Sequence, residues 1–427
     1  SLHSIISTSI EMGIFKNHKV VSFIAILFVL IFALVIRLIF LEADPPTSLT
    51  PSGSLRTDEG WKVHNALNKS LFGQWKIGPY NLWLLMAPVF TLIEFIFFSI
   101  FGVSLATARL VSVFSGIGTI VLVYLILKQE RESSVALLAA LFLSSNFVFT
   151  MFNRLAFLES LMLFFITTAW FFWQKAIISS RYYLSSATAL AVFLAFLVKP
   201  YSLIVVPILV FAFLVSNKRT TGLLDVNNVK HYFYFFSTIV TLGLVWLFFW
   251  FLPKYDSFVS PNYGSLGESY FKLLESRLGL MKWVSTVTSF LGKVPYFFSN
   301  MPIITLLSFV FVAFSIFRIS FLSKQKIDLT QSFALSWIVV CTVFLASISY
   351  RPPRYLTLLI PPMAVASAIM LEIVLSVKEL CLSSFRLDRL LYVLFCLAFL
   401  DFVCATLLLD QLDNFSLPAI FMLFFCG

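Results

Sequence analysis

Hydrophobic runs of bilayer-spanning length recur along nearly the whole chain, separated by short polar turns. A helix needs about 20 apolar residues to cross the hydrocarbon core, because each residue adds about 1.5 Å to its length. The runs predict spanning helices over 20–41, 105–127, 134–152, 158–174, 183–198, 201–216, 232–252, 301–320, 331–349, 354–375 and 390–410, with a shorter run over 415–426. The pattern therefore predicts an all-α polytopic membrane protein.

The stretch 82–101 is also apolar, but it contains Glu94, and a carboxylate is costly in lipid. It either spans the membrane or lies at the interface, and this choice inverts the orientation of everything after it. The positive-inside rule favours the second topology, because every short inner turn is then basic if the N-terminus is cytoplasmic. We therefore expect one integral membrane domain, 1–427, with two long outer loops, 42–104 and 253–300, and juxtamembrane helices on the outer face.

Composition agrees with this class of protein. The 427 residues are 60% hydrophobic and 12% charged, whereas a soluble domain carries about 25% charged residues. This excludes a water-soluble enzyme. The formal net charge of +10 does not imply a nucleic-acid partner here, because basic loops hold a membrane protein against anionic lipid or bind an anionic substrate.

Two adjacent carboxylates, Asp58 and Glu59, follow Thr57, which is a suitable N-cap for a short helix just outside the first span. The helix dipole keeps such carboxylates ionised, so they are able to act as a general base or to bind a metal. A simple pair of solvated capping acids is the alternative. His64 shares a helical face with neither acid, so a surface histidine is favoured over a metal ligand.

Further charges interrupt the apolar runs at the predicted outer ends of the spans. The acid among them is Glu159, and both snorkelling to the interface and a functional role are open for it. The cations are Arg109, Arg154, Lys199, Arg351 and Arg354. Because arginine suits bidentate phosphate recognition, these cations indicate an anionic site on the outer face, opposite the three acids. Such a site fits a lipid-linked sugar phosphate, whose leaving group the cations stabilise while a carboxylate deprotonates the acceptor hydroxyl.

Short strings along the chain match one superfamily in order. They are Asp58-Glu59-Gly60, Phe101-Gly102-Val103-Ser104, Ala108-Arg109-Leu110, the segment Arg154 to Glu159, Lys199-Pro200 and Arg354-Tyr355-Leu356. The chain resembles the GT-C fold glycosyltransferases, specifically the protein O-mannosyltransferase and aminoarabinose (lipid A) transferase-like branch. The resemblance implies about 11–13 transmembrane helices and an inverting hexosyl- or pentosyltransferase of the cell envelope. Its active site is expected on the outer (periplasmic) face of the cytoplasmic (inner) membrane.

By this resemblance the donor is a polyprenyl-phosphate sugar, and the acceptor is a glycan, a lipid or a protein. Asp58 is the expected base, Glu59 belongs to the same catalytic motif, and Glu159 orients the acceptor or the base. The expected ligands of the donor phosphate are Arg109, Arg154, Lys199, Arg351 and Arg354. No cofactor is required, and the sequence gives no support for a divalent metal.

Two departures from the family pattern stand out. Glu159 occupies a position where the family usually has Asp, and Lys76-Ile77-Gly78-Pro79-Tyr80 replaces a Glu-Lys/His-Pro-Pro string. The replacement has no acid and one proline, so the resemblance does not imply a metal site or donor contact at this string. Two other functions stay open on the sequence: a transporter or flippase of an anionic lipid-linked substrate, and a polysaccharide polymerase or ligase. The aromatic residues of 253–300 favour a membrane-interface belt over an acceptor-binding lid.

Overall fold

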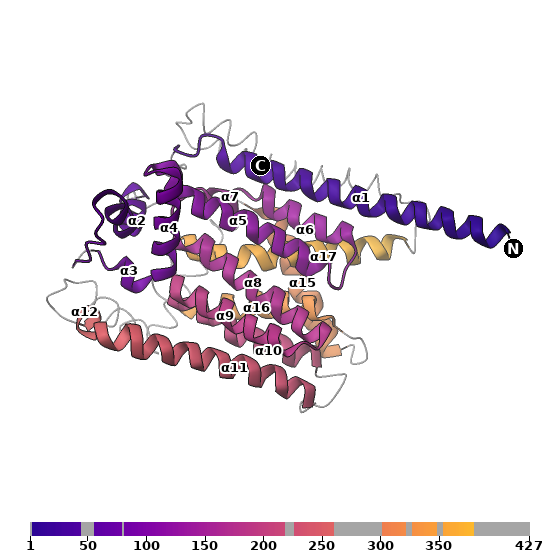
Figure 1. Ribbon diagram of the computed structural model, residues 1–427. Helices are drawn as coiled ribbons and strands as arrows, with labels where there is room; N and C mark the ends of the chain where they lie inside the picture. The colour runs from indigo at the N-terminus through magenta and orange to yellow at the C-terminus, as the bar shows by residue number, and fades with distance from the viewer. Residues whose placement is uncertain are drawn as a thin grey trace.

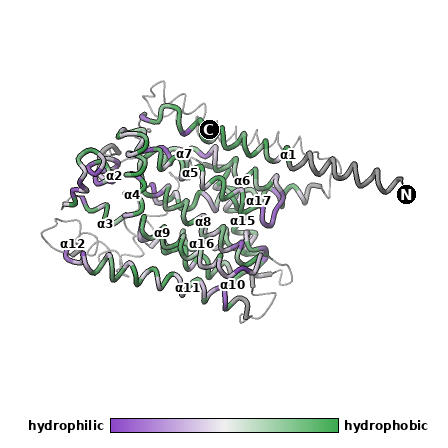
Figure 2. Tube along the Cα trace, viewed as in Figure 1, coloured by the Kyte–Doolittle hydropathy of each residue, from purple (hydrophilic) through white to green (hydrophobic). Residues whose placement is uncertain are grey.

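The computed structural model describes residues 2–43, 55–78, 81–217, 226–259, 301–321, 327–347 and 353–379. The elements in these ranges are helices, apart from one isolated β-bridge between Gly78 and Asn81. The long helices lie side by side along one direction and form an elongated bundle (Figure 1). Hydrophobic residues run along the lengths of these helices, and hydrophilic residues gather mainly in α2 (Leu55–Phe72) and around the turns (Figure 2). The expected all-helical architecture is confirmed.

Seven helices of the described residues are long and apolar enough to cross a membrane. They cover Val20–Leu38 of α1 (Leu2–Leu38), α5 (Leu105–Leu127), α8 (Leu158–Ser179), Val229–Ser257, Pro302–Ser320 of α15 (Pro302–Phe321), α16 (Leu329–Ser347) and Arg354–Ser376. The Val229–Ser257 span joins α11 (Val226–Trp246), a π-helical turn η3 (Leu247–Phe251), η4 (Leu252–Lys254) and α12 (Tyr255–Val259). The last span joins the 3-10 helix η6 (Pro353–Leu359) to α17 (Ile360–Glu379). Shorter apolar helices are α9 (Tyr182–Val198) and the pair η2 (Pro200–Ile204) and α10 (Val205–Asn217).

The span predicted over 134–152 corresponds to a bent pair of helices that together are long and apolar enough to cross a membrane. The helix breaks at Asn146 into α6 (Ser133–Ser145) and α7 (Phe147–Asn153), whose axes differ by 63°. The Asn146 side chain accepts a hydrogen bond of 2.8 Å from the amide of Phe149, which starts a new helix instead of continuing the old one. The predicted runs over 390–410 and 415–426 lie outside the described residues.

Three helices close one end of the bundle. They are α2, α3 (Trp83–Met86) and α4 (Pro88–Phe101), and α4 runs across the direction of α5 and α8 (Figure 1). With 14 residues α4 is about 21 Å long, shorter than the roughly 30 Å hydrocarbon core. The stretch that contains Glu94 thus covers the end of the bundle, in agreement with the topology in which it does not span.

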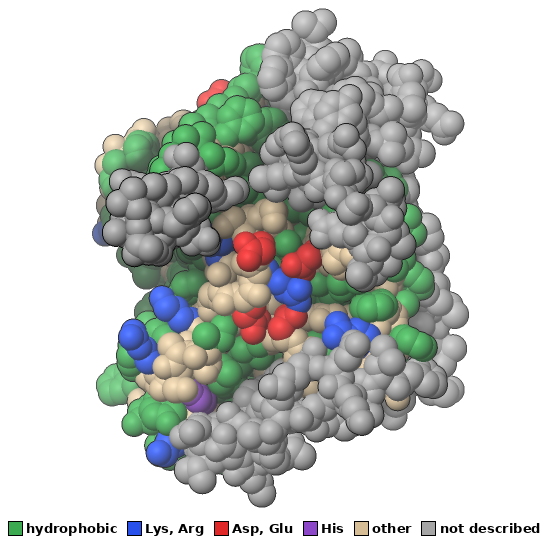
Figure 3. All heavy atoms as spheres, turned by 90° about the vertical axis from the view of Figure 1, so that its right-hand side faces the viewer, with side chains coloured by type: hydrophobic (Ala, Val, Ile, Leu, Met, Phe, Trp, Pro, Cys, Tyr) green, Lys and Arg blue, Asp and Glu red, His purple; other side chains and the backbone are tan. Residues whose placement is uncertain are grey.

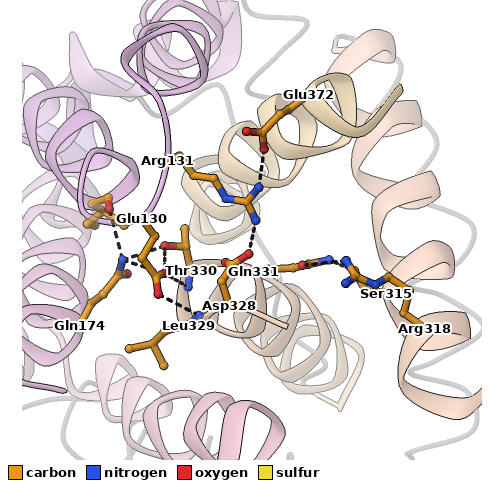
Figure 4. Close-up of polar contacts among 11 residues, drawn as sticks. Glu130, Arg131, Gln174, Ser315, Arg318, Asp328, Leu329, Thr330, Gln331 and Glu372 are labelled. Carbon is orange, nitrogen blue, oxygen red and sulfur yellow. Dashed lines mark hydrogen bonds and ion pairs between the residues drawn. The ribbon is translucent and has the colours of Figure 1, made fainter. Parts of the chain in front are cut away.

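The opposite end is held by a polar cluster that joins the N-terminal and C-terminal helices (Figure 4). Arg131, in the turn between α5 and α6, pairs with Asp328 and, at 2.5 Å, with Glu372 of α17. Glu130 accepts hydrogen bonds of 2.7 and 2.6 Å from the amide and hydroxyl of Thr330 at the start of α16. Figure 3 views this end of the molecule, with acidic and basic side chains gathered near its centre. The cluster fixes α16 and α17 against the first half of the chain.

Candidate functional site

The candidate site lies at the end of the bundle that α2, α3 and α4 cover. Here α1 ends, α5 and α8 begin, and α9 passes into η2, so helix ends from distant parts of the sequence lie at one end of the bundle (Figure 1). Helix ends expose unsatisfied backbone groups, which attract charged side chains. The charged side chains predicted from the sequence therefore do two things. Some donate hydrogen bonds to backbone groups at the helix ends, and some form ion pairs with one another.

Glu59 and Arg109 form a buried ion pair that attaches α2 to α5. Arg109 Nε lies 3.0 Å from Glu59 Oε1, and Arg109 Nη2 lies 2.7 Å from Glu59 Oε2. Glu59 Oε1 also accepts a 2.7 Å hydrogen bond from the amide of Ala156, just before α8. Arg109 Nη1 donates to the carbonyl oxygens of Leu41 and Ala43 at 2.8 and 2.9 Å. This geometry favours a framework role for both side chains over direct chemistry.

Arg154 attaches the end of α1 to the turn before α8. Its Nη1 donates to the carbonyl oxygen of Ile36 at 2.7 Å, and its Nη2 donates to that of Phe40 at 2.6 Å. A cation at a helix C-terminus is stabilised by the last carbonyl groups and by the helix dipole. The buried guanidinium of Arg154 therefore also favours a framework role, and a phosphate contact by Arg154 or Arg109 stays a prediction.

Glu159 is the centre of a second charged cluster, in the first turn of α8. One of its oxygens lies 2.5 Å from Lys199 Nζ and 3.2 Å from Arg354 Nε. The carboxylate is buried, while the Lys199 and Arg354 side chains keep exposed fractions of 13% and 15%. The second oxygen, Oε2, has no hydrogen-bond partner among the described residues. Three residues that the sequence singled out separately are thus brought together, with both cations reachable from outside.

Aromatic rings enclose this cluster. Lys199 Nζ lies 4.9 Å from the ring centre of Tyr201 and 4.4 Å from that of Tyr355. The Arg354 guanidinium lies 5.4 Å from the ring centre of Phe157. Cation–π contacts of this kind hold a cation in place without neutralising its charge. The cluster therefore presents oriented positive charge.

Asp58 lies in the first turns of α2, and its side chain is outside the described part of the structure. Helical periodicity places it on one face of α2 with Lys62, four residues on, and about 100° away from Glu59. Lys62 is buried, and its Nζ lies 3.8 Å from the centre of the Phe157 ring. Sequence reasoning missed Lys62, because its one signal, a spacing of four residues from Asp58, is common in polar helices.

Glu94 is a second residue whose chemistry the sequence did not indicate. It is fully buried in α4, and neither carboxyl oxygen has a hydrogen-bond partner among the described residues. Burial, and then the nearby charge of Glu59, raise the pKa of Glu94 well above its usual value. Both causes favour the protonated, uncharged form of Glu94, which is the form that a buried position in α4 tolerates best.

The remaining predicted residues are placed as follows. Arg351 and most of 253–300 lie outside the described residues. His64 is exposed, which confirms it as a surface histidine, and its ring contacts the side-chain amides of Asn68 and Asn81. The described side chains contain no group of three or more His, Cys, Asp and Glu residues able to hold a metal ion.

Comparison with known proteins connects this arrangement to a family. Residues 86–247, less than half of the chain, match the model of the dolichyl-phosphate-mannose-protein mannosyltransferase family. The matched segment includes Arg109, Arg154, Glu159 and Lys199, whereas Asp58 precedes it. A comparison with curated protein sequences gives no match.

Solved structures of the oligosaccharyltransferase of Archaeoglobus fulgidus resemble the fold of this chain over 92–94% of its length. The apo form is 14% identical with a TM-score of 0.57, over 94% of this chain and 56% of that one. The form tethered to an acceptor peptide with an NVT sequon is 14% identical with a TM-score of 0.56, over 94% and 55%. The complex with Zn and sulfate is 15% identical with a TM-score of 0.53, over 92% and 52%. This chain thus spans about half the length of that enzyme, and the expected GT-C fold and the resemblance to the mannosyltransferase family are confirmed.

Proposed function

We propose that this protein, which has the GT-C fold, is a membrane glycosyltransferase that takes a hexose or pentose from a polyprenyl-phosphate donor. The observation that carries the proposal is the buried Glu159 carboxylate held between Lys199 and Arg354, at the end of the bundle where α2 carries Asp58. Oriented cations beside a carboxylate suit the transfer of a group away from phosphate, because negative charge develops on the leaving oxygen. The mannosyltransferase-like segment supports the same reaction class.

The reaction we propose is a single displacement at the anomeric carbon. The acceptor hydroxyl loses its proton to the Asp58 carboxylate as its oxygen bonds to that carbon. The bond from the anomeric carbon to the phosphate oxygen breaks at the same time, and the electron pair leaves with polyprenyl phosphate. Attack opposite to the leaving group inverts the configuration. Glu159 keeps Lys199 and Arg354 aimed at the phosphate, and Arg351 remains a further candidate for this contact.

Glu59, Arg109 and Arg154 have a different task in this proposal. Their hydrogen bonds fix α2, α5 and the end of α1 against one another. A rigid scaffold places the base near the phosphate, and small displacements of reacting groups cost large factors in rate. We therefore assign these three residues to positioning, and the phosphate contact to Lys199 and Arg354.

The location we propose is the outer face of the cytoplasmic membrane. The basic inner turns favour this orientation through the positive-inside rule. The apolar sides of the helices provide a path for the polyprenyl chain, and the acceptor is a glycan, lipid or protein on that face. The likeness to an oligosaccharyltransferase favours a second candidate, the transfer of a whole glycan chain, which analysis of the product size distinguishes.

A donor-turnover assay tests the proposal. Purified protein in liposomes is incubated with radiolabelled polyprenyl-phosphate hexoses and pentoses and with a membrane extract as acceptor. We expect polyprenyl phosphate and a labelled acceptor to form, and Asp58→Asn to abolish both. Asp256→Asn is the matched control, because Asp256 is an exposed acid in α12. Movement of intact donor across the liposome membrane without sugar release would instead indicate a flippase and overturn the proposal.

A further inference from the structure

Lys62 is a buried cation of the site to which the family resemblance assigns no task. It lies on α2, the helix that carries Asp58, and only 4% of its surface is exposed. Moving an ammonium group out of water costs several kcal/mol, so a buried lysine keeps its charge only where negative charge lies nearby. The surroundings of Lys62 therefore indicate what the site is built to hold.

The Lys62 ammonium points at the start of α8. Its Nζ lies 3.8 Å from the ring centre of Phe157, the residue that precedes α8, and its charge acts on Glu159. Arg354 approaches the same Phe157 ring. Lys62, Arg354 and Lys199 thus converge on one short segment from three different elements.

Contacts on other faces of α2 fix the rotation of this helix about its axis, and they therefore fix the direction in which Lys62 points. Glu59 binds Arg109 on one side of the helix. Asn65 accepts a 3.0 Å hydrogen bond from the amide of Leu84 and donates at 2.9 Å to the carbonyl oxygen of Trp75. With these contacts made, the face shared by Asp58 and Lys62 is held in one orientation.

The charges of the cluster match the proposed reaction at each stage. The cluster has three cations, Lys62, Lys199 and Arg354, and two anions, Glu159 and an ionised Asp58. Its net charge is therefore one positive charge, which balances the single negative charge of a sugar phosphodiester. After transfer Asp58 carries the acceptor proton, so two positive charges remain. The product is then a phosphomonoester, whose second pKa of about 6 makes it largely dianionic at neutral pH. Without Lys62 the cluster would have one positive charge too few to neutralise the phosphate, both before and after the sugar is transferred.

We infer that Lys62 is a third phosphate-binding residue, whose ammonium contacts the lipid-linked phosphate and balances the charge that the phosphate gains when its bond to the sugar breaks. The inference rests on the proposed function and deepens it. It adds a cation from α2, the helix that carries Asp58, to Lys199 at the junction of α9 and η2 and to Arg354 of η6. It also predicts selectivity for a lipid that carries a single phosphate over the same lipid alcohol.

Binding of undecaprenyl phosphate and of undecaprenol, measured by native mass spectrometry, tests the inference without a known acceptor. We expect Lys62→Met to weaken phosphate binding about ten- to hundredfold, the effect of losing a charged hydrogen bond. Binding of undecaprenol should not change, and Lys62→Arg should recover most of the affinity. Lys69→Met is the matched control, because Lys69 lies on the same helix and donates to the carbonyl of Gly73 at the surface. Lys62→Gln replaces Lys62→Met if that variant does not fold.

Two other results separate failure of this inference from failure of the proposed function. If Lys62→Met or Lys62→Gln binds undecaprenyl phosphate as the wild type does, while Lys199→Met loses it, the inference is overturned and the proposed function stands. If the wild type binds undecaprenyl phosphate and undecaprenol equally, the proposed function fails, and the inference fails with it.

Discussion

Arg109 engages both carboxylate oxygens of Glu59, at 3.0 Å from Nε and 2.7 Å from Nη2, although 50 residues separate the two along the chain. This fork-to-fork pair is buried and includes the motif acid next to Asp58. In the proposed reaction the two adjacent acids therefore have different tasks. Glu59 holds the helix in place, and Asp58 is left for chemistry in the proposed reaction.

The Glu59–Arg109 pair should behave as one structural unit. We expect Glu59→Gln or Arg109→Met alone to lower the free energy of unfolding by about 3–5 kcal/mol, because each leaves a buried charge without its partner. The double variant should lose less than the sum of the two. Thermal unfolding in detergent measures all three. A stable Arg109→Met protein that has lost polyprenyl-phosphate binding would contradict the framework role and restore the phosphate role.

Glu159 should be needed for turnover more than for phosphate binding. Glu159→Gln keeps the shape but releases Lys199 and Arg354, so we expect transfer to fall about a hundredfold, a loss of roughly 2.7 kcal/mol in transition-state stabilisation. Glu159→Asp is one methylene shorter and should be intermediate. Rates of donor turnover and binding of undecaprenyl phosphate check this. Wild-type turnover by Glu159→Gln, or loss of phosphate binding, would contradict the assigned role.

Glu94 should make stability depend on pH in a defined direction. Its pKa is raised in the folded state by burial and by Glu59, so the folded protein retains a proton that the unfolded chain releases above about pH 4.3. Stability therefore falls as the pH rises from there towards the folded pKa. We expect Glu94→Gln to flatten this decline, as measured by the unfolding temperature between pH 5 and 8. Identical slopes for variant and wild type would show that Glu94 is ionised when folded.

The polar cluster at the other end should support stability and leave the candidate site unchanged. Arg131 pairs with Asp328 and Glu372, but these side chains are partly exposed and water screens them. We expect Arg131→Met to cost about 1–2 kcal/mol of stability and to leave the KM for the donor unchanged. Arg181→Met, at an exposed arginine of the same end, serves as the control. A raised KM in Arg131→Met would show that the two ends are coupled.

Much of the fold could be predicted from the sequence, because a long apolar run identifies a helix that is able to cross a membrane. The break at Asn146 was not predicted, because it depends on one side chain that caps α7 within an apolar stretch. The run containing Glu94 was ambiguous, since the burial of Glu94 depends on tertiary packing. Hydropathy predicts that a segment is removed from water, but it does not predict whether lipid or other helices surround that segment.

The sequence predicted which charged residues belong to the candidate site better than it predicted which of them form ion pairs. Glu159, Lys199 and Arg354 were recognisable because a charge in an apolar setting is costly and therefore conspicuous. Their meeting at one carboxylate, and the pairing of Arg109 with Glu59, depend on contacts between distant segments. Lys62 was not predicted, because a lysine in a polar helix is common and only the burial of this one makes it unusual.

The most direct test of the central claim is the position of the phosphate in a cryo-electron microscopy structure of the protein with undecaprenyl phosphate. The account predicts density for the phosphate within hydrogen-bonding distance of Lys199 and Arg354, with Asp58 on the side from which the acceptor enters. A phosphate bound elsewhere, such as beside Arg131 at the opposite end of the bundle, would contradict it.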